Sequence, residues 1–426
     1  MNLQERDQKH LWHPYTQHQT AAKPIGIVKA KDALLWGEDG KEYIDGISSW
    51  WVNSFGHSNP HLAQAAYKQL SRLEHILFGG FTHEPAVQLA EELLAILPDK
   101  QKIFYSDNGS TAVEVALKMA IQYFFNKGQR KHTIIAFENA FHGDTFGAMA
   151  ASGISFFTES FKEQLLEVVR IPIPEKGKEH LSEEKLLEAI SKHQVAAFIF
   201  EPLVQGAAGM KIYDEKALDR FISIAKSHQI ITIADEVMTG FGRTGKNFAC
   251  EYLSNQPDII CLSKALTGGT IPLAVTATTQ DIFDAFYDSD VNKALFHGHT
   301  YMANPTACAI ALEAIRLLQS DETRQNIKRI EQHHKAFAQQ LNKHPKAKNI
   351  RTLGIILAFE VEVAGNTSYY GNIRNELYNF FIENGIILRP IGNTIYVLPP
   401  YIITNAQLQR IYEVILKAID HITDKK

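Results

Sequence analysis

Short apolar runs alternate with amphipathic stretches through the middle of the chain. Two of the amphipathic stretches, Ser110 to Phe124 and Glu215 to Ala225, place their apolar residues on one helical face. Between such stretches, short continuous apolar runs are typical of strands that are buried on both faces. The runs are KIFYS (102–106), TIIAF (133–137), AAFIFEP (196–202), IITIAD (230–235) and DIICLS (258–263). Strands that alternate with helices predict an α/β fold, in which helices cover both faces of a mostly parallel sheet.

The C-terminal part of the chain has a different pattern. It contains the strand-like segments LGIILAFEVE (353–362), GIILRP (385–390) and TIYVLPP (394–400), followed by a helix that opens with the capping-box pattern Thr404-Asn405-Ala406-Gln407. We therefore expect a smaller α+β lobe beside the large domain. The predicted parts are an N-terminal segment over residues 1–55 that joins the small lobe, a large domain over residues 56–300 and a small C-terminal domain over residues 301–426.

Composition and charge exclude several classes of function. Hydrophobic residues make up 45% of the 426 residues and charged residues 21%, which is the balance of a soluble globular protein. The formal net charge of −4 offers no broad basic surface to nucleic acid or to an anionic membrane. The N-terminus is too polar for a secretory signal, and no apolar run approaches the roughly 20 residues that cross a bilayer. The 3 cysteines are scattered without a CxxC spacing, so we expect a cytoplasmic protein with no nucleic-acid or membrane partner.

Polar residues at the predicted strand ends are the candidate functional residues, because ligands of open α/β sheets bind beyond the carboxyl ends of the strands. The strand KIFYS is followed by Asp107-Asn108-Gly109-Ser110-Thr111 and then by a helix. Glycine lets the backbone approach a ligand, and the first N–H groups of a helix are free to bind an anion. Gly109 and Ser110 are therefore candidates for an anion site, and an ordinary helix cap after a tight turn is the alternative.

Two later strands end in residues of opposite charge. Asp235 closes an apolar strand, where a carboxylate stays ionised only beside a cation or a strong donor. A helix cap or a surface acid is the alternative for Asp235. Most lysines are solvated, but Lys264 follows the apolar run DIICLS and precedes Gly268-Gly269, which places it at the ligand edge of the sheet. A shielded lysine has a lowered pKa and can form a Schiff base with an aldehyde, so we predict Asp235 and Lys264 as catalytic residues.

A polar turn, His297-Gly298-His299-Thr300, precedes another apolar helix. No carboxylate or further histidine lies at a spacing suited to a metal, so we predict no metal site here. The hydroxyl of Thr300 is a candidate donor to a phosphate group. Helix capping is its alternative role.

The segment Gly240-Phe241-Gly242-Arg243-Thr244-Gly245 matches the GxGxxG pattern of dinucleotide-binding proteins. Glu236 lies between the preceding strand and the first glycine, where it would repel a pyrophosphate. No clear helix follows the segment, and no acid closes a second strand about 20 residues further on. A Rossmann dehydrogenase or an adenosylmethionine methyltransferase is therefore the weaker alternative, and a yellow purified protein would favour an aldehyde cofactor over a nicotinamide.

Taken together and in this order, the motifs resemble those of the class III aminotransferases, in the fold-type-I pyridoxal-phosphate family. The resemblance spans nearly the whole chain. It rests on HLWHPYTQ (10–17), DGISSWWVNSFGHSNP (45–60), AFHGDTFGAM (140–149), EPLVQGAAGM (201–210), DEVMTGFGRTG (235–245), LSKALTGG (262–269), HGHTYMANP (297–305) and LRPIGNTIYVLPPY (388–401). The WHPYTQ, SSWW and LRPIGNTIY segments resemble the biotin-pathway branch, which implies 8-amino-7-oxononanoate as amino acceptor and S-adenosylmethionine as amino donor.

The resemblance also implies a homodimer with pyridoxal 5'-phosphate as cofactor, bound in the large domain. Lys264 resembles the lysine that binds the cofactor covalently and moves the substrate proton, and Asp235 resembles the partner of the pyridine nitrogen. The implied cofactor contacts are Gly109, Ser110, Phe141, Asp235, Lys264, His299 and Thr300, with Thr300 reaching the phosphate from the other subunit. The implied substrate contacts are Tyr15, Trp50, Phe141, Asp144, Arg243, Lys264, Gly298 and Arg389.

The physical demands of the implied acceptor agree with these positions. A long apolar keto acid needs aromatic walls, which Tyr15, Trp50 and Trp51 offer, and one planar cation for its carboxylate, which Arg389 offers. Core packing is the alternative for either tryptophan, and an internal salt bridge is the alternative for Arg389.

The sequence departs from the biotin-pathway pattern at Phe141, where those enzymes carry a tyrosine. Phenylalanine keeps the stacking face and loses the hydroxyl, which leaves the amino donor open. The alternative within the family is an ω-aminotransferase that acts on ornithine, 4-aminobutyrate or a diamine.

Overall fold

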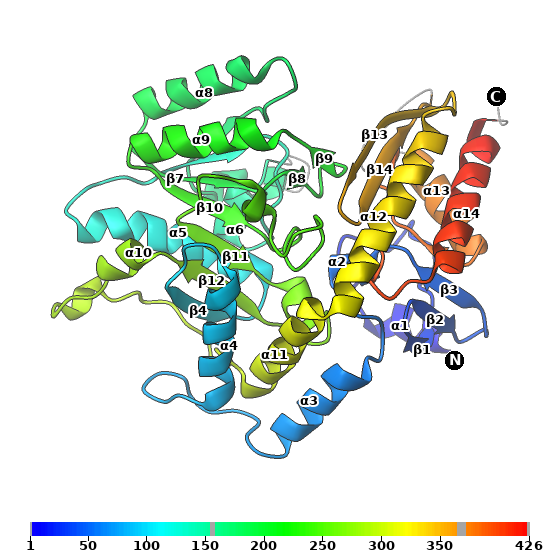
Figure 1. Ribbon diagram of the computed structural model, residues 1–426, viewed down its shortest axis with the longest axis horizontal. Helices are drawn as coiled ribbons and strands as arrows, with labels where there is room; N and C mark the ends of the chain where they lie inside the picture. The colour runs from blue at the N-terminus through cyan, green and yellow to red at the C-terminus, as the bar shows by residue number, and fades with distance from the viewer. Residues whose placement is uncertain (1, 154–157, 364–371, 424–426) are drawn as a thin grey trace.

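A 7-stranded sheet lies at the centre of the larger part of the molecule in the computed structural model, which describes residues 2–153, 158–363 and 372–423 (Figure 1). Its strand order is β4-β12-β11-β10-β7-β5-β6. The strands are β4 (Lys102–Ser106), β5 (Thr133–Phe137), β6 (Val168–Ile171), β7 (Val195–Phe200), β10 (Ile231–Asp235), β11 (Ile259–Leu262) and β12 (Ala274–Thr278). Because β12 pairs antiparallel with both β4 and β11, and the other pairs are parallel, β4 runs in the same direction as the rest.

Helices cover both faces of this sheet, as the alternation of strands and helices predicts. Every residue of β5, β7, β10 and β11 is buried. Ile134 packs with α5 (Gly109–Asn126), whereas its neighbour Ile135 packs in the cluster that holds α9 (Glu215–Ser227). Since successive side chains of a strand point to opposite faces, the two helices lie on opposite sides of the sheet.

The apolar runs of the sequence correspond to β4, β5, β7, β10 and β11, with small shifts at their ends. The sequence interpretation did not include β6 and β12. It also extended a strand through GIILRP, whereas only β15 (Ile386–Ile387) is a strand there. Arg389 lies beyond β15 because Pro390 has no N–H for a ladder hydrogen bond and restricts the residue before it.

Two smaller sheets form the rest of the core, next to α12 and α14 in Figure 1. One has the order β1-β2-β3-β15 and the other the order β13-β14-β16. The remaining strands of these sheets are β1 (Ile27–Lys31), β2 (Leu34–Gly37), β3 (Glu42–Asp45), β13 (Ala347–Leu353), β14 (Ile356–Val361) and β16 (Thr394–Val397). Because β15 pairs in parallel with β3, the N-terminal and C-terminal segments meet in one sheet.

The helices after residue 300 contact both parts of the molecule. These are α11 (Pro305–Gln319), α12 (Asp321–Leu341), α13 (Asn372–Glu383) and α14 (Asn405–Thr423). The first of them, α11, packs against α3 (Pro60–Leu70), α4 (Glu84–Ile96) and the short turn η3 (Lys264–Thr267), so the predicted domain boundary at residue 300 falls before a helix that still contacts the large domain. The capping box before α14 is confirmed, because the backbone N–H groups of Thr404 and Gln407 each donate to the other residue's side chain.

The other named elements are short or peripheral. They are α1 (Leu3–His10), α2 (Ser48–Trp51), α6 (Phe146–Ala151), η1 (Glu159–Gln164), α8 (Glu179–Lys192), β8 (Val204–Gln205), β9 (Lys211–Ile212), η2 (Ala249–Tyr252), α10 (Gln280–Asp284) and η4 (Val291–Lys293). Across the described ranges, no helix combines the length and the apolar character that a membrane crossing requires.

Candidate active site

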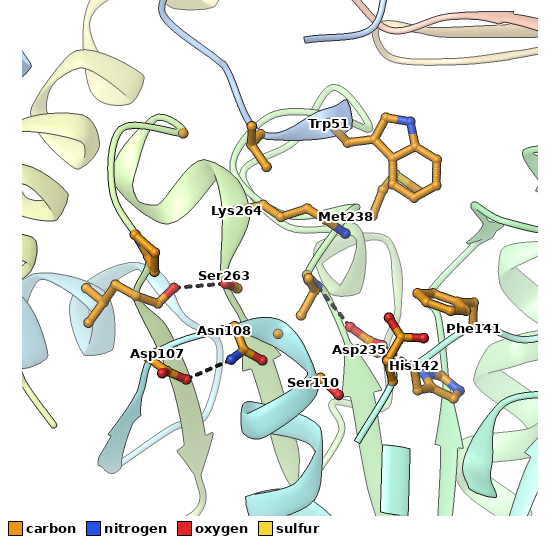
Figure 2. A pocket seen from close by; sticks show the side chains of 18 of the residues that line it. Trp51, Asp107, Asn108, Ser110, Phe141, His142, Asp235, Met238, Ser263 and Lys264 are labelled. Carbon is orange, nitrogen blue, oxygen red and sulfur yellow. Dashed lines mark hydrogen bonds and ion pairs between the residues drawn. The ribbon is translucent and has the colours of Figure 1, made fainter. Parts of the chain in front are cut away.

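A cavity of about 430 Å³ lies where the ends of the parallel strands converge (Figure 2). The loop after β4 contributes Asp107–Ser110, and the loop after β5 contributes Phe141–Asp144. Glu201 after β7, Asp235 of β10 and Lys264 after β11 also line it. This is the edge of the sheet at which α/β proteins bind ligands, so the topology places the predicted catalytic residues together.

Lys264 extends into this cavity from the first position of η3 (Figure 2). Its Nζ lies 5.1 Å from the centre of the Trp51 ring. Burial lowers the pKa of the Lys264 amine, and the charges of Asp235 and Glu201 oppose this shift. Ser263, the preceding residue, anchors the turn by donating its hydroxyl hydrogen bond to the carbonyl of Leu273 at 2.8 Å. A shielded amine with a lowered pKa is suited to act as a nucleophile or a base.

Asp235 is buried at the end of β10, with 5% of its surface exposed. Its Oδ2 lies 2.8 Å from Nδ1 of the buried His142, and its Oδ1 accepts from the backbone N–H of Val237 at 3.1 Å. These contacts rule out the surface-acid alternative for Asp235. The sequence interpretation missed His142, although this residue directly follows Phe141 in a turn that also closes a buried strand.

Glu201 is a second buried carboxylate that the sequence interpretation missed. Its two carboxylate oxygens accept from the backbone N–H groups of Phe141 at 3.0 Å and Gly206 at 2.9 Å. Burial raises the pKa of Glu201 to about 7, with a further raising effect from Asp235 and an opposing effect from His142. The signal was the same as for Asp235, since Glu201 ends the apolar run AAFIFEP.

The N-terminus of α5 offers an anion site on the floor of the cavity. Among the described residues, no acceptor bonds the backbone N–H groups of Gly109 and Ser110. Asn108 caps the helix by accepting from Thr111 N–H at 3.0 Å, so the capping alternative for Ser110 does not hold. The Ser110 hydroxyl instead lies 2.8 Å from the hydroxyl of Thr145. Free N–H groups at the start of an 18-residue helix favour a phosphate or a carboxylate.

A second cavity, of about 400 Å³, adjoins the first at Lys264. The residues that line both cavities are Trp51, Val52, Phe141, Asp144 and Lys264. The second cavity is largely aromatic, and its lining includes Tyr15, Trp50, Tyr396 and Arg389.

Arg389 brings a guanidinium group to the second cavity, which Lys264 also lines. Its guanidinium carbon lies 4.6 Å from the centre of the Trp50 ring. No carboxylate within the described ranges forms an ion pair with Arg389, so the internal salt bridge that the sequence left open is not found there. Tyr15 lies edge-on to Trp50 and donates its hydroxyl hydrogen bond to Asp144.

Trp50 and Trp51 reach the two cavities from a turn with an unusual backbone. Ser48, Ser49, Trp50 and Trp51 have φ values of 51°, 45°, 70° and 71°. These left-handed conformations cost roughly 1–2 kcal/mol per residue for side chains other than glycine. No local sequence signal predicts such a turn, so the surrounding structure must hold it.

Several residues that the resemblance assigns to the site lie outside both cavities. Arg243 is fully buried and donates from Nη1 to the hydroxyl of Ser48 at 3.0 Å and from Nη2 to the carbonyl of Trp51 at 3.2 Å, so it lies behind the tryptophans. Gly298 and Thr300 lie exposed in the loop before α11, and His299 lies between them. The contacts with cofactor or substrate that the resemblance implies for Gly298, His299 and Thr300 are therefore not made within this one chain.

Comparison with known protein families gives a match over residues 15–419 to the family described as Aminotransferase class-III. Curated relatives carry the name adenosylmethionine-8-amino-7-oxononanoate aminotransferase. The protein of that name from Synechococcus elongatus is 43% identical, and the match covers 97% of this chain and 99% of the relative. The one from Staphylococcus aureus is 35% identical, with 100% of this chain and 98% of the relative covered.

Solved structures with the same fold include enzymes of two kinds. The adenosylmethionine-8-amino-7-oxononanoate aminotransferase of Methanocaldococcus jannaschii has a TM-score of 0.93 and 32% identity, and the match covers 99% of both chains. The omega transaminase of Pseudomonas jessenii in complex with PMP has a TM-score of 0.93 and 28% identity, with 100% of this chain and 99% of that chain covered.

The raised pKa of Glu201 predicts a pH effect on stability. The folded protein keeps a proton on Glu201 up to about pH 7, whereas the unfolded chain releases it near the ordinary value of 4.5. Stability from this proton is therefore fully present below pH 4.5 and is lost as the pH rises towards 7. Unfolding of the wild type and of Glu201→Gln from pH 5 to pH 8 should give a stability difference, wild type minus variant, that falls with rising pH.

Glu183→Gln is the matched control for this measurement. The Glu183 carboxylate is paired with Arg220, which lowers the pKa of Glu183. The difference in stability between the wild type and Glu183→Gln should therefore stay constant from pH 5 to pH 8. A constant difference for Glu201→Gln as well would show that Glu201 is ionised throughout.

Proposed function

The chain belongs to the class III aminotransferases, and we propose that it transfers an amino group from S-adenosylmethionine to 8-amino-7-oxononanoate, forming the 7,8-diaminononanoate of biotin biosynthesis. The full-length relatives named above support this substrate pair. The observation in the structure that carries the proposal is Arg389, which has no partner carboxylate in the described residues and lies against Trp50 in an aromatic cavity adjoining Lys264. The names of the relatives favour this function over an ω-aminotransferase acting on ornithine, 4-aminobutyrate or a diamine.

The first cavity fits pyridoxal 5'-phosphate, the cofactor on which aminotransferases of this class depend. Its lining has an amine for the aldehyde at Lys264, a carboxylate for the ring nitrogen at Asp235 and free backbone N–H groups for the phosphate at Gly109 and Ser110. Phe141 offers an aromatic face to the ring. When bound, the cofactor supplies an electron sink for the bonds at the amino-bearing carbon of the substrate.

The chain's own residues then have separable tasks. The lowered pKa of Lys264 makes its unprotonated amine available, so Lys264 can take a proton from the substrate carbon and return it. His142 holds Asp235 through the 2.8 Å contact, which fixes the carboxylate towards the cavity. Trp51 and Phe141 line both cavities and exclude water from the space around the Lys264 amine.

The second cavity is suited to bind the proposed amino acceptor. An aliphatic keto acid would place its chain along the apolar faces of Trp50 and Tyr396 and its carboxylate at Arg389. Arg389 is suited to this contact because a planar guanidinium binds a carboxylate through two parallel hydrogen bonds. Tyr15 and Asp144 line the same cavity and offer polar contacts to the amino donor.

We also propose that the active form is a homodimer in which Thr300 reaches the phosphate of the partner's cofactor. Thr300 is exposed and lines neither cavity of its own chain. It lies in one of two adjacent segments, 67–81 and 287–301, which contact each other through His75 and Tyr301. These segments carry exposed large apolar side chains at Tyr67, Leu70, Leu77, Phe81, Tyr287, Val291, Phe296 and Tyr301. An exposed apolar surface of this kind is typical of a subunit interface.

The cysteines support a further part of the proposal, that the enzyme acts in the reducing cytoplasm. Cys250, Cys261 and Cys308 are all free and buried. Unpaired thiols in the core are typical of proteins that fold in a reducing compartment.

Lys264 is the lysine that should carry the cofactor. The purified protein should absorb visible light, and borohydride reduction should fix the cofactor to the peptide that contains Lys264, as read by peptide mass analysis. Lys264→Ala should lose the covalent adduct and transamination. An adduct on another lysine, such as the buried Lys100, would contradict the assignment.

Arg389 should determine the affinity for the keto acid. Leaving one partner of a shielded arginine–carboxylate pair alone costs about 2–5 kcal/mol, so Arg389→Ala should raise the KM for 8-amino-7-oxononanoate by tens-fold or more. Arg389→Lys should restore only part of the affinity, because lysine lacks the planar fork. Single-turnover measurements of the two half-reactions should show much less damage to the amino-donor half. Equal damage to both halves would contradict an acceptor-specific role.

Thr300 should act across the subunit interface, which a complementation experiment can test. Lys264→Ala and Thr300→Glu homodimers should both have little activity. After the two variants are mixed and their subunits exchanged, each hybrid dimer should hold one intact site, giving about a quarter of wild-type activity at equal amounts. No recovery despite confirmed hybrid formation would show that Thr300 does not act across the interface.

A further inference from the structure

The left-handed turn at Ser48–Trp51, here called the tryptophan turn, has no glycine to explain its backbone. Its residues are two serines and two tryptophans, and all have positive φ. The turn is nevertheless regular, because the N–H groups of Trp51 and Val52 bond to the carbonyls of Ile47 and Ser48 at 2.8 Å and 2.9 Å. Left-handed residues normally occur singly in proteins, so a run of them must be held by contacts from outside the turn.

Asp45 holds the beginning of the tryptophan turn. It is fully buried. Its Oδ1 accepts from the backbone N–H groups of Ile47 at 3.1 Å and Ser49 at 3.0 Å. Its Oδ2 accepts from the Ser49 hydroxyl at 2.9 Å and lies 2.9 Å from Nε2 of His57. One carboxylate therefore fixes the direction in which the backbone enters the turn.

Arg243 holds the end of the tryptophan turn. Besides its bonds to Ser48 and Trp51, it donates from Nη2 to the carbonyl of Asn53 at 3.3 Å and to the hydroxyl of Ser54 at 3.2 Å. Arg243 is fully buried, and beyond the turn it also donates from Nη1 to the carbonyl of Pro399 at 3.5 Å and places its guanidinium carbon 5.3 Å from the centre of the Tyr401 ring.

The tryptophan turn connects these two clamps to the active site. Trp50 carries its ring to the guanidinium of Arg389, and Trp51 carries its ring to the amine of Lys264. Trp51 also donates from its indole nitrogen to the Tyr396 hydroxyl at 3.2 Å. Adjacent residues of an ordinary right-handed turn would point in other directions, because the handedness of the backbone sets where each Cβ points.

We propose that Asp45 and Arg243 are positioning residues that hold the tryptophan turn left-handed and thereby set the shape of the cavity for the acceptor chain. The inference deepens the proposed function and rests on it, because it assigns the second cavity to a long-chain carboxylate. Neither residue lines either cavity. The turn contributes only Trp51 to the lining of the first cavity, whereas the residues that would hold the cofactor lie at the strand ends, so loss of a clamp should affect binding of the acceptor before it affects binding of the cofactor.

The first test measures a ligand that needs only the second cavity. Nonanoate, a straight-chain carboxylate, should bind the cofactor-loaded wild type. Asp45→Ala should raise the dissociation constant of nonanoate by about tenfold or more, since small displacements of positioning groups have effects of this size. The lysine-bound visible absorbance should be retained in Asp45→Ala. Unchanged nonanoate binding in this variant would overturn the proposal.

A matched pair at Ser49 tests the handedness itself, and it decides the question if Asp45→Ala does not fold. Ser49 is exposed, and both Ser49→Gly and Ser49→Ala lose the hydroxyl bond to Asp45. Only glycine adopts a positive φ without a steric penalty. Ser49→Gly should therefore unfold at a higher temperature than Ser49→Ala and bind nonanoate more tightly. Equal values for the two variants in both measurements would overturn the proposal.

The outcomes also separate this proposal from the proposed function. If nonanoate binds the wild type no better than it binds Arg389→Ala, the acceptor site itself is wrong, and the positioning role falls with it. If the wild type binds well and Arg389→Ala does not, the acceptor site stands. An Asp45→Ala variant with wild-type affinity would then overturn only the role of the clamps.

Discussion

The contact between His142 and Asp235 is the interaction on which the rest of the site depends. Burying a carboxylate is costly unless it is hydrogen-bonded, and Asp235 ends a strand that is buried at every residue. The 2.8 Å contact with His142 satisfies one oxygen and Val237 N–H satisfies the other. Because His142 directly follows Phe141 in the loop after β5, this contact also ties that loop to the end of β10. The Asp235 carboxylate and the Phe141 ring, which both line the first cavity, are thus fixed together.

Different parts of the fold build the two cavities that meet at Lys264. The strand ends of the central sheet build most of the first cavity, with Glu201 fixing Phe141 from a third strand. The second cavity is built by segments far apart in the sequence, the tryptophan turn and the chain around Arg389, which meet because β3 pairs with β15. Lys264 lies at the junction of the two. Changes in the segments around Trp50 and Arg389 can therefore reshape the second cavity while Lys264 and Asp235 stay in place.

The predictable part of this structure is the part with a local signal. The apolar runs predicted the central strands, and an acid and a lysine at strand ends predicted Asp235 and Lys264. Glu201 and His142 carried the same kind of signal and could have been found by the same reasoning. The antiparallel direction of β12 could not be predicted in this way, because a strand's direction depends on the loop that precedes it and on its neighbours. The turn at Trp50 could not either, since its residues individually prefer the right-handed conformation.

Residues that act beyond their local element were the hardest to place. Arg243 belongs to a GxGxxG-like segment and lies behind the tryptophans, a position that depends on tertiary packing alone. Thr300 carries a role predicted for a second chain, which no distance within one chain can test. Arg389 was predicted inside a strand and lies beyond one, yet its charge still reaches the aromatic cavity.

The identity of both substrates can be tested in one measurement. The purified enzyme, loaded with pyridoxal 5'-phosphate, is incubated with 8-amino-7-oxononanoate and with S-adenosylmethionine carrying nitrogen-15 in its amino group. The product is then analysed by mass spectrometry. We expect 7,8-diaminononanoate with the heavy nitrogen on the carbon that bore the ketone. Absence of this product, in a preparation that turns over ornithine, 4-aminobutyrate or a diamine, would contradict it.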